Sequence, residues 1–327
     1  MNHNDIQWLT ERLPPIEPTV LRSEPDYYGA SHEIAIQLGR AKAPRSFATW
    51  RHGWVYQPIA HVRQLVPWGS AKERHLVATE AHVQTLKAFG FERAVAVGLP
   101  FIYAPDSKVL RQPNTLLVMP SHSLPYTSHT WDEHSYVAAI AQLKDQFSQI
   151  VACVHSSCLI KGTWITEFDR YGIPWIVGAT VEDRNALHRM ATIFRSFETM
   201  TTNAIGSHLP YAAYAGCKLS IYGPFAEFSE KDFEKDPWYS QYPDLLKHVI
   251  LHGRESAIRQ QCPQFFVHPE NAVTHEEWGK AVLGDSYRRN SKAIAQFLGW
   301  SPAEQIAGHL RRTAKALQRK MSRRGGA

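Results

Sequence analysis

The strongest constraint on the fold is a regular alternation of short apolar runs and helix-period segments, which starts near residue 75 and continues to about residue 222. Short apolar runs bounded by turn residues predict strands, which we place at 75–79, 94–97, 116–119, 150–154, 175–177, 199–202 and 219–222. Apolar residues three or four positions apart predict helices, which we place at 81–89, 136–147, 166–171, 186–197 and 209–215. This order predicts an α/β fold with a parallel sheet covered on both faces.

Outside this region the pattern is weaker. Residues 1–74 begin with several prolines, and within them 34–38 is typical of a helix, whereas we place no strand there. Residues 224–250 are acidic and aromatic with three prolines, which indicates an insertion packed on the sheet. A chain of 327 residues has room for about two domains, each with its own core. We predict an N-terminal domain over 1–112, a second domain over 113–300 and a tail over 301–327.

The positive charge of the chain is confined to its end. The formal net charge is +6, and residues 301–327 hold seven basic residues and one acidic residue, so the rest of the chain is neutral. A neutral body offers no basic groove for nucleic acid, and we predict no nucleic-acid partner. From 306 to 321 the apolar residues fall on one helical stripe, which is typical of a helix lying in an anionic membrane surface. The alternative is a helix packed back over the first domain with a solvated basic face.

The cysteines and the N-terminus indicate an intracellular protein. The four cysteines form no Cys-x-x-Cys pair and show no regular spacing, so neither structural zinc nor a disulfide framework is predicted. The chain begins with no apolar signal segment, and no run approaches 18 apolar residues. We expect a cytoplasmic protein with reduced thiols, either free or peripheral at the inner face of the membrane.

Small and polar residues follow three of the predicted strands, and parallel α/β sheets bind ligands at such strand ends. Asn203, Gly206, Ser207 and His208 lie between a strand and a helix, where free backbone N–H groups and the helix dipole favour an anion. An ordinary capped helix is the alternative. The segment Ser121-His122-Ser123 and the residue His155 follow two other strands, and for these the alternative is a solvated polar loop.

The first domain supplies further polar turns. Arg51-His52-Gly53-Trp54 is one, and another ends at Glu33. A histidine near its ordinary pKa can act as a general base or hold a phosphate. The chain carries no His-Glu-x-x-His, no Asp-x-Asp strand-end loop and no Gly-x-x-x-x-Gly-Lys-Ser/Thr loop, so we predict neither a metal site nor a P-loop.

Three segments together resemble the GT-B glycosyltransferases, in which two Rossmann-like domains face each other across a cleft. LVATEAHVQTLKAFGFERAVAVGLPFIYA is similar to the end of their N-terminal domain, and LLVMPSHS to the first strand and loop of their donor-binding domain. TTNAIGSHLPYAAYAGCKLSIYG is similar to the late strand–helix–strand unit of bacterial capsule and surface-polysaccharide transferases, including the Kdo and glycerophosphate transferring groups. The resemblance covers about residues 75–223.

The resemblance implies a donor site and a base. Residues that would contact the donor nucleotide or its phosphate are Ser121, His122, His155, Asp183, Arg189, Asn203, Gly206, Ser207 and His208. An inverting enzyme needs a base on the acceptor side, for which the candidates are His52 and Glu33. The late helix carries Tyr211 and Tyr214 where many relatives place carboxylates, so the identity of the donor stays open.

The implied function is metal-independent transfer of a sugar from a nucleotide-sugar donor to a glycan or lipid-linked acceptor in surface-polysaccharide biosynthesis. In this fold helix dipoles and basic or hydroxyl side chains neutralise the leaving phosphate, so no cofactor is expected. Two alternatives stay open. One is a nucleotide-sugar epimerase or hydrolase, and the other is a non-catalytic protein that binds a nucleotide or a glycan.

Overall fold

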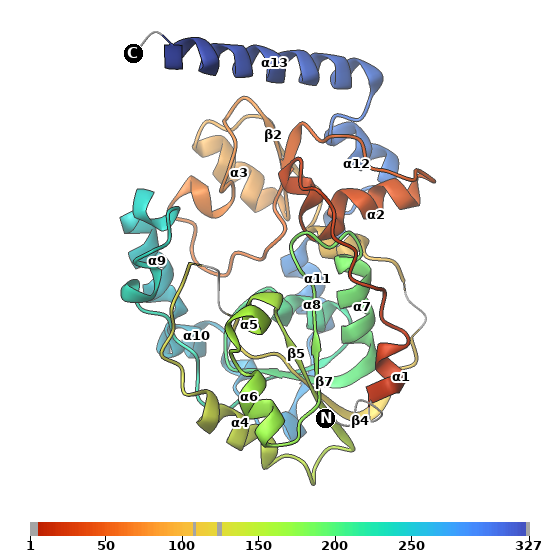
Figure 1. Ribbon diagram of the computed structural model, residues 1–327, viewed down its shortest axis with the longest axis vertical. Helices are drawn as coiled ribbons and strands as arrows, with labels where there is room; N and C mark the ends of the chain where they lie inside the picture. Colours follow the sequence, from red (N-terminus) through yellow and green to blue (C-terminus); the bar gives the residue numbers. More distant parts are fainter. Residues whose placement is uncertain (1–5, 107–108, 123–125, 325–327) are drawn as a thin grey trace.

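The computed structural model describes residues 6–106, 109–122 and 126–324, and their side chains up to residue 314. It contains two sheets built mainly of parallel strands (Figure 1). The first has the order β1-β2-β3 and lies in the N-terminal part of the chain. Its strands are β1 (Ala48–Trp50), β2 (Arg74–Val77) and β3 (Ala94–Ala96), and both pairings are parallel.

The second sheet has six strands in the order β6-β5-β4-β7-β8-β9. Its strands are β4 (Gln112–Val118), β5 (Gln149–Val154), β6 (Trp175–Val177), β7 (Phe197–Thr202), β8 (Lys218–Ile221) and β9 (Val273–Thr274). All pairings are parallel except that of β8 with β9. From β4 the chain proceeds outward through β5 to β6 and then returns to the other side of β4 as β7. The strand order therefore reverses between β4 and β7, which is where open α/β sheets bind ligands.

Helices connect and cover the strands. In the first part these are α2 (Ala30–Gln37) and α3 (Glu80–Ala88), and a kinked 3-10 segment (Glu24–Gly29) precedes α2. The second sheet carries α4 (Glu133–Ala141), α5 (Ser156–Lys161), α6 (Ile165–Arg170), α7 (Ala186–Ser196) and α8 (His208–Tyr214). After β8 come α9 (Pro243–Gly253), α10 (Glu255–Gln261), α11 (Glu276–Leu283), α12 (Ser291–Phe297) and α13 (Pro302–Arg324).

Both faces of the second sheet are buried, as the sequence pattern predicts. Successive side chains of a strand point to opposite faces. Leu116 of β4 accordingly packs with Tyr136 of α4 and Phe168 of α6 in one cluster, whereas Leu117 packs with Phe194 of α7 in another. Near-continuous apolar runs are required of strands that are buried in this way, and this is why the sequence reveals these strands.

The predicted elements between residues 75 and 222 are confirmed within a few residues, with three differences. Helix α5 was not predicted. Strand β4 begins at Gln112, before the predicted strand at 116–119, and its pairing with β7 shifts register between Gln112 and Leu116. The predicted helix at 136–147 begins earlier and ends at Ala141. The predicted fold class is confirmed as α/β, with two units that are each built on a sheet of mainly parallel strands.

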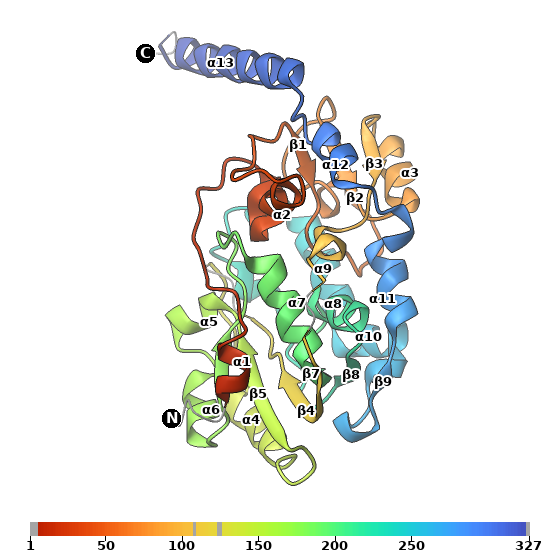
Figure 2. The ribbon, with the colours of Figure 1, turned by 90° about the vertical axis from the view of Figure 1, so that its right-hand side faces the viewer.

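The two ends of the chain each pack on the opposite unit. Helix α1 (Gln7–Thr10) lies against the second sheet, where the Trp8 Nε1 donates to Gln149 Oε1 at 2.7 Å and the Trp8 ring contacts Phe197 (Figure 2). Near the other end, α12 packs against α2, and Phe47 N donates to Leu298 O. The chain therefore joins its two units at both ends as well as through its middle.

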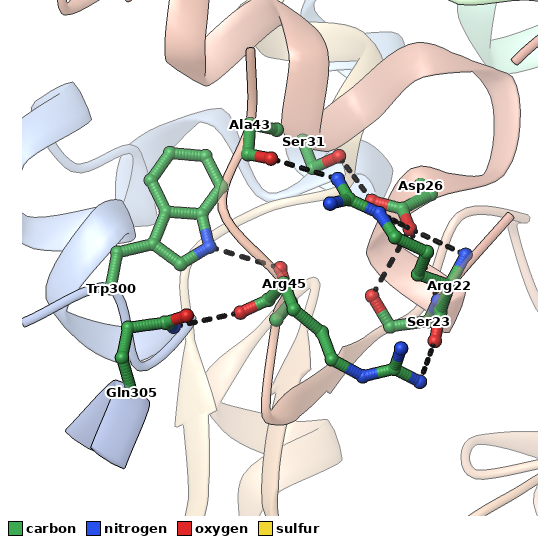
Figure 3. Close-up of polar contacts among 9 residues, drawn as sticks. Arg22, Ser23, Asp26, Ser31, Ala43, Arg45, Trp300 and Gln305 are labelled. Carbon is green, nitrogen blue, oxygen red and sulfur yellow. Dashed lines mark hydrogen bonds and ion pairs between the residues drawn. The ribbon is translucent and has the colours of Figure 1, made fainter. Parts of the chain in front are cut away.

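A polar network fixes the start of α13 to the first unit (Figure 3). Buried Asp26 accepts hydrogen bonds from Arg22 N and Ser31 Oγ, at 2.8 and 2.6 Å. The side chain of Arg45 donates to Arg22 O, and Arg45 O in turn accepts from Gln305 of α13 at 2.9 Å. Beyond this contact α13 extends across the top of the molecule in both ribbon views (Figures 1 and 2).

Candidate functional site

A cavity of about 270 Å³ lies where the two sheets meet. The first unit lines it with residues that follow β1 and β3, among them His52, Gly53 and Phe101. The second unit lines it with residues at the ends of β4, β5, β6 and β7. Both sheets thus direct the carboxyl ends of their strands at one enclosed space, the place where parallel α/β proteins hold ligands.

A smaller cavity of about 140 Å³ adjoins it, and His122 and His208 line both. Its far wall is apolar and comes from the segment between β8 and α10, which includes Phe228, Phe233 and Ile250. The acidic, aromatic insertion predicted over 224–250 therefore closes one end of the site. The two histidines mark the boundary between a compartment at the sheet ends and a second compartment under this insertion.

Three histidines of the second unit line the main cavity, and burial lowers the pKa of each. His122 and His155 lie at adjacent strand ends with ring centroids 4.9 Å apart, and His155 together with His208 further lowers the pKa of His122. The pKa of His208 falls to about 4, and its Nε2 lies 3.0 Å from Thr202 Oγ1. These rings are neutral at pH 7, so each can donate and accept a hydrogen bond.

Asn203 lies at the end of β7, where the strand order reverses between β4 and β7. Its Oδ1 accepts from Ser121 N at 2.9 Å and its Nδ2 donates to Pro224 O at 3.3 Å, and the side chain is buried. Asn203 lines neither cavity, so its contacts hold the ends of β4 and β7 together. Ser121 lines the smaller cavity. Ser123, which the sequence placed beside it, lies outside the described residues.

The turn before α8 reaches both cavities. Gly206 lines the smaller one, and a Cβ there would approach His208 Nδ1 to 2.9 Å, so a larger residue would displace that imidazole. Ser207 lines the main cavity, and its Oγ accepts from Trp54 N at 2.9 Å. The hydroxyl therefore bonds to the first unit and makes no capping bond within α8. This bond joins the two units across the cavity wall.

His52 lies on the opposite wall, after β1. Its backbone O accepts from the Tyr211 hydroxyl of α8, and its ring contacts Tyr27 and Tyr28. Its Nδ1 is shielded from water and has no hydrogen-bond partner among the described residues. Burial and then the charge of Arg51 lower the pKa of His52 to about 3.

Besides Asn203, three of the predicted site residues lie outside both cavities. Glu33 is buried on α2, and its Oε1 accepts from Gln37 at 2.9 Å. Asp183 is fully buried, and its Oδ1 accepts from the N–H groups of Glu17 and Asn185. These carboxylates hold backbone and side-chain donors in place.

Arg189, predicted to contact the donor, is the third, and it lines neither cavity. Its guanidinium donates to the backbone carbonyls of Pro14, Val177 and Gly178. Around Asp183 and Arg189, the residues that line the main cavity are the apolar Ala186, Leu187 and Met190.

Sequence reasoning missed several residues near the cavity. Tyr28, Phe101 and Tyr211 line it, and the charge of Arg51 lowers the pKa of Glu24, His52 and His82. The signal that could have found them is position, because Arg51 follows β1 and His82 starts the helix after β2. Because β1 is absent from the prediction, the turn that holds Arg51 was not recognised as a strand end.

Within the described part of the chain, no group of three His, Cys, Asp or Glu side chains could hold a metal ion. The four cysteines are buried and none of them forms a disulfide bond. No helix of the described residues is long and apolar enough to cross a membrane.

Comparison with known proteins gives distant structural likenesses alone. No protein-family model and no curated protein sequence matches the chain. The pneumococcal O-GlcNAc transferase GtfA in complex with UDP and GlcNAc is similar with a TM-score of 0.29 and 14% identity, over 68% of this chain and 45% of that chain. TarM gives a TM-score of 0.30 and 12% identity, over 68% of this chain and 42% of that chain.

A UDP-glucose: anthocyanidin 3-O-glucosyltransferase in complex with UDP gives a TM-score of 0.29 and 13% identity, over 89% of this chain and 68% of that chain. The chain spans less than half the length of GtfA and TarM. At this level of similarity they identify no donor or acceptor, and the function of the chain is inferred from its own strand order and cavity.

Proposed function

We propose that the protein is a glycosyltransferase that moves a sugar from a nucleotide-sugar donor to a glycan or lipid-linked acceptor. The observation that supports this most is the cavity at which the carboxyl ends of two parallel sheets meet. A reaction between two substrates needs each to be bound on its own side of one enclosed space. Two sheets facing one cavity provide two such sides.

The shape of the site supports a ligand of two parts. The main and the smaller cavity share His122 and His208 as a common wall. A nucleotide sugar is a nucleoside and a sugar joined by phosphate, and it fits two compartments with polar groups between them. Neutral imidazoles and the Ser207 hydroxyl can donate hydrogen bonds to that phosphate. A bound phosphate would in turn raise the pKa of the histidines, since an anion favours their charged form.

The transfer itself needs a proton acceptor and a way to stabilise the leaving group. The acceptor hydroxyl oxygen forms a bond to the anomeric carbon, the bond from that carbon to the phosphate oxygen breaks, and the phosphate leaves with the electron pair. The hydroxyl proton passes to a base. Of the two bases that the sequence offered, His52 lines the cavity, whereas Glu33 does not reach it. We assign the base to His52, with no metal ion in the reaction.

We place this activity in the synthesis of a surface polysaccharide such as capsule or lipopolysaccharide, at the inner face of the membrane. The support is the resemblance of residues 201–223 to such transferases together with the surface of α13. Ile306 and Leu310 of α13 are 64% and 66% exposed, next to exposed Arg311 and Arg312. An exposed apolar pair beside basic residues fits an anionic lipid surface.

A thermal-shift screen with CMP, UDP, GDP and dTDP tests the donor site. A ligand that binds the folded chain must raise the melting temperature, by an amount that grows with concentration above Kd. We expect one or two of the four to do so. If none raises it at millimolar concentration, the proposal of a nucleotide-sugar donor is wrong. Product analysis with the matching nucleotide sugar then separates transfer from epimerisation and hydrolysis.

A further inference from the structure

Arg51 is a cation beside Gly53, which lines the main cavity. The proposed function gives Arg51 no role. It directly follows β1, and its backbone N donates to Leu76 O at 3.0 Å. In the side chain, Nε donates to Gly53 O at 2.9 Å, which fixes the plane of the guanidinium. The two terminal nitrogens make no hydrogen bond to any described residue. The guanidinium is thus held in place at one nitrogen while its two terminal nitrogens remain free.

The structure pairs this guanidinium with no carboxylate of the described residues. None lies within 4 Å of it, and burial lowers its pKa more than the charge of Glu24 raises it. Glu24 is the carboxyl group nearby, but burial raises its pKa to about 7 and its Oε2 is shielded with no partner among the described residues. The Nδ1 atoms of His52 and His82 are also shielded and unpartnered. An enclosed charge among unsatisfied polar atoms is costly unless a further group completes the hydrogen bonds.

Gly53 leaves a space between Arg51 and the second unit. A Cβ at Gly53 would lie 3.6 Å from Arg51 Nη2 and 3.3 Å from Ser207 Oγ. Gly53 and Ser207 both line the main cavity. The absent side chain of Gly53 therefore opens a path from the cavity to the guanidinium, with a hydroxyl donor on the other side.

We propose that Arg51 and Ser207, one from each unit, bind a phosphate or diphosphate group in the space left open by Gly53. This rests on the proposed function in taking the phosphate to be that of a nucleotide-sugar donor. Arginine presents several N–H donors in one plane, which match phosphate oxygens in pairs. When the sugar leaves, negative charge develops on the phosphate, and Arg51 would stabilise it from the acceptor side of the cavity.

The proposal explains the state of the neighbouring groups. The charge of Arg51 lowers the pKa of both His52 and His82. A bound phosphate would offset that charge and so raise the pKa of His52, making it a stronger base only when the donor is present. Donor binding and the readiness of the proposed base would thus be coupled through Arg51.

The test is isothermal titration of the full chain with pyrophosphate. We expect Arg51→Gln to weaken pyrophosphate binding at least tenfold and Arg51→Lys to weaken it less. Gly53→Ala should also weaken binding with the charge retained, because its Cβ occupies the proposed space. Arg93→Gln is the control, since Arg93 is exposed before β3 and donates to Lys72 O. Circular dichroism and melting curves establish that each variant folds.

A second arm identifies the source of the phosphate. A nucleoside diphosphate that shifts the melting temperature is titrated beside its nucleoside, into the native chain and Arg51→Gln. If Arg51→Gln weakens binding of the nucleoside diphosphate but not of the nucleoside, the phosphate that Arg51 binds belongs to the donor. If Arg51→Gln weakens binding of pyrophosphate but not of the nucleoside diphosphate, the phosphate that Arg51 binds belongs to an anionic acceptor. Equal pyrophosphate affinity in the native chain and Arg51→Gln, or no pyrophosphate binding at all, overturns the proposal.

These outcomes are distinguishable from a failure of the proposed function. If pyrophosphate binding depends on Arg51 but the chain turns over no nucleotide sugar, the phosphate site is supported and the proposed transferase activity is wrong. If the chain turns over a nucleotide sugar but Arg51→Gln leaves pyrophosphate binding unchanged, the protein is a transferase and the proposed phosphate site is wrong.

Discussion

His52, His82 and His208 are three histidines that the fold keeps uncharged. Burial lowers their pKa values to about 3, 4 and 4, and Arg51 contributes at the first two. An unfolded histidine titrates near 6.5. The unfolded chain therefore binds these protons more readily than the folded protein, so the stability associated with them is complete above about pH 6.5 and is lost as the pH falls toward 4.

We predict that the free energy of unfolding decreases between pH 7.5 and pH 5.0. Glu24 works in the opposite direction, because its raised pKa of about 7 contributes stability that is present below about pH 4.5 and is lost as the pH rises through 7. Three histidines outweigh one carboxyl group, and each net proton changes stability by up to about 1.4 kcal/mol per pH unit. Urea unfolding at the two pH values measures the difference, and His208→Asn should reduce it. An equal or higher stability at pH 5.0 would contradict this account.

The role of His52 as base predicts a selective loss of activity. His52→Ala should lower kcat about 100-fold or more, the usual contribution of a general base, while nucleotide affinity changes little. Initial rates at saturating donor and a titration with the nucleotide measure the two effects. His134→Ala, on the exposed side of α4, is the matched control. Full transfer activity with an unchanged product in His52→Ala would exclude the role.

Residue types alone can predict part of this site. His122, His155, His208 and Ser207 each follow a strand whose apolar run is visible in the sequence, and all line the main cavity. Asp183 and Arg189 are candidates by their charge, yet their charges are used to bind backbone groups of 14–17 and 177–178. Such long-range backbone partners leave no local pattern, so a charged residue near a strand end cannot be assigned to the ligand or to the fold from sequence.

At the level of elements, burial on both faces decides which strands can be predicted. β5 and β6 are apolar along almost their whole length, and the predicted ranges match them almost to the residue. β1 is three residues long, Ala-Thr-Trp, between polar turns, and it gives no comparable run. It is identified only by its parallel pairing with β2, a contact about 26 residues away. The pattern therefore predicts β2, α3 and β3 of the first unit but not β1.

The helix that carries Ser207 and His208 depends on close packing with α11. A Cβ at Gly279 of α11 would lie 2.7 Å from Tyr214 N and 2.9 Å from Ala213 Cβ, both in α8. We predict that Gly279→Ala forces the helices apart and destabilises the fold by about 1–3 kcal/mol, the usual cost of overpacking. Urea unfolding checks this.

The control for Gly279→Ala is Glu277→Ala, whose side chain is 89% exposed on the same helix. Because the turn before α8 lines both cavities, Gly279→Ala should also weaken nucleotide binding. Unchanged stability and affinity would mean that α8 and α11 can adjust without cost.

On the scale of the whole molecule, helices near both ends of the chain pack on the opposite unit and so join the two units. Helix α1 binds the second sheet, and α12 with the start of α13 binds the first unit. Gly308 of α13 is required there, since a Cβ would lie 2.5 Å from the Phe47 ring. This contact fixes the helix to the body near its start and leaves Ile306 and Leu310 outward. The sequence left a packed tail and a membrane-binding tail open, and the described part of α13 combines the packed start with an exposed apolar pair.

Because Ile306 and Leu310 are exposed beside basic residues, we predict that the chain binds anionic vesicles. The full chain should float with vesicles rich in phosphatidylglycerol and not with pure phosphatidylcholine, and high salt should release it because screening weakens the attraction to basic residues. A chain lacking residues 306–327 and the variant Ile306→Ser/Leu310→Ser should float less. Equal flotation of all three with the anionic vesicles would sink the membrane proposal.

The central claim is that the cavity between the two sheet ends transfers a sugar from a nucleotide sugar. Its most direct test is the release of free nucleotide from labelled nucleotide sugars by the native chain, His52→Ala and Arg51→Gln, with a lipid-linked glycan extract as acceptor. The account predicts that one donor is consumed by the native chain, with the label in a larger glycan, and that both variants are at least tenfold slower. Intact donors with the native chain, or equal rates in all three proteins, would contradict it.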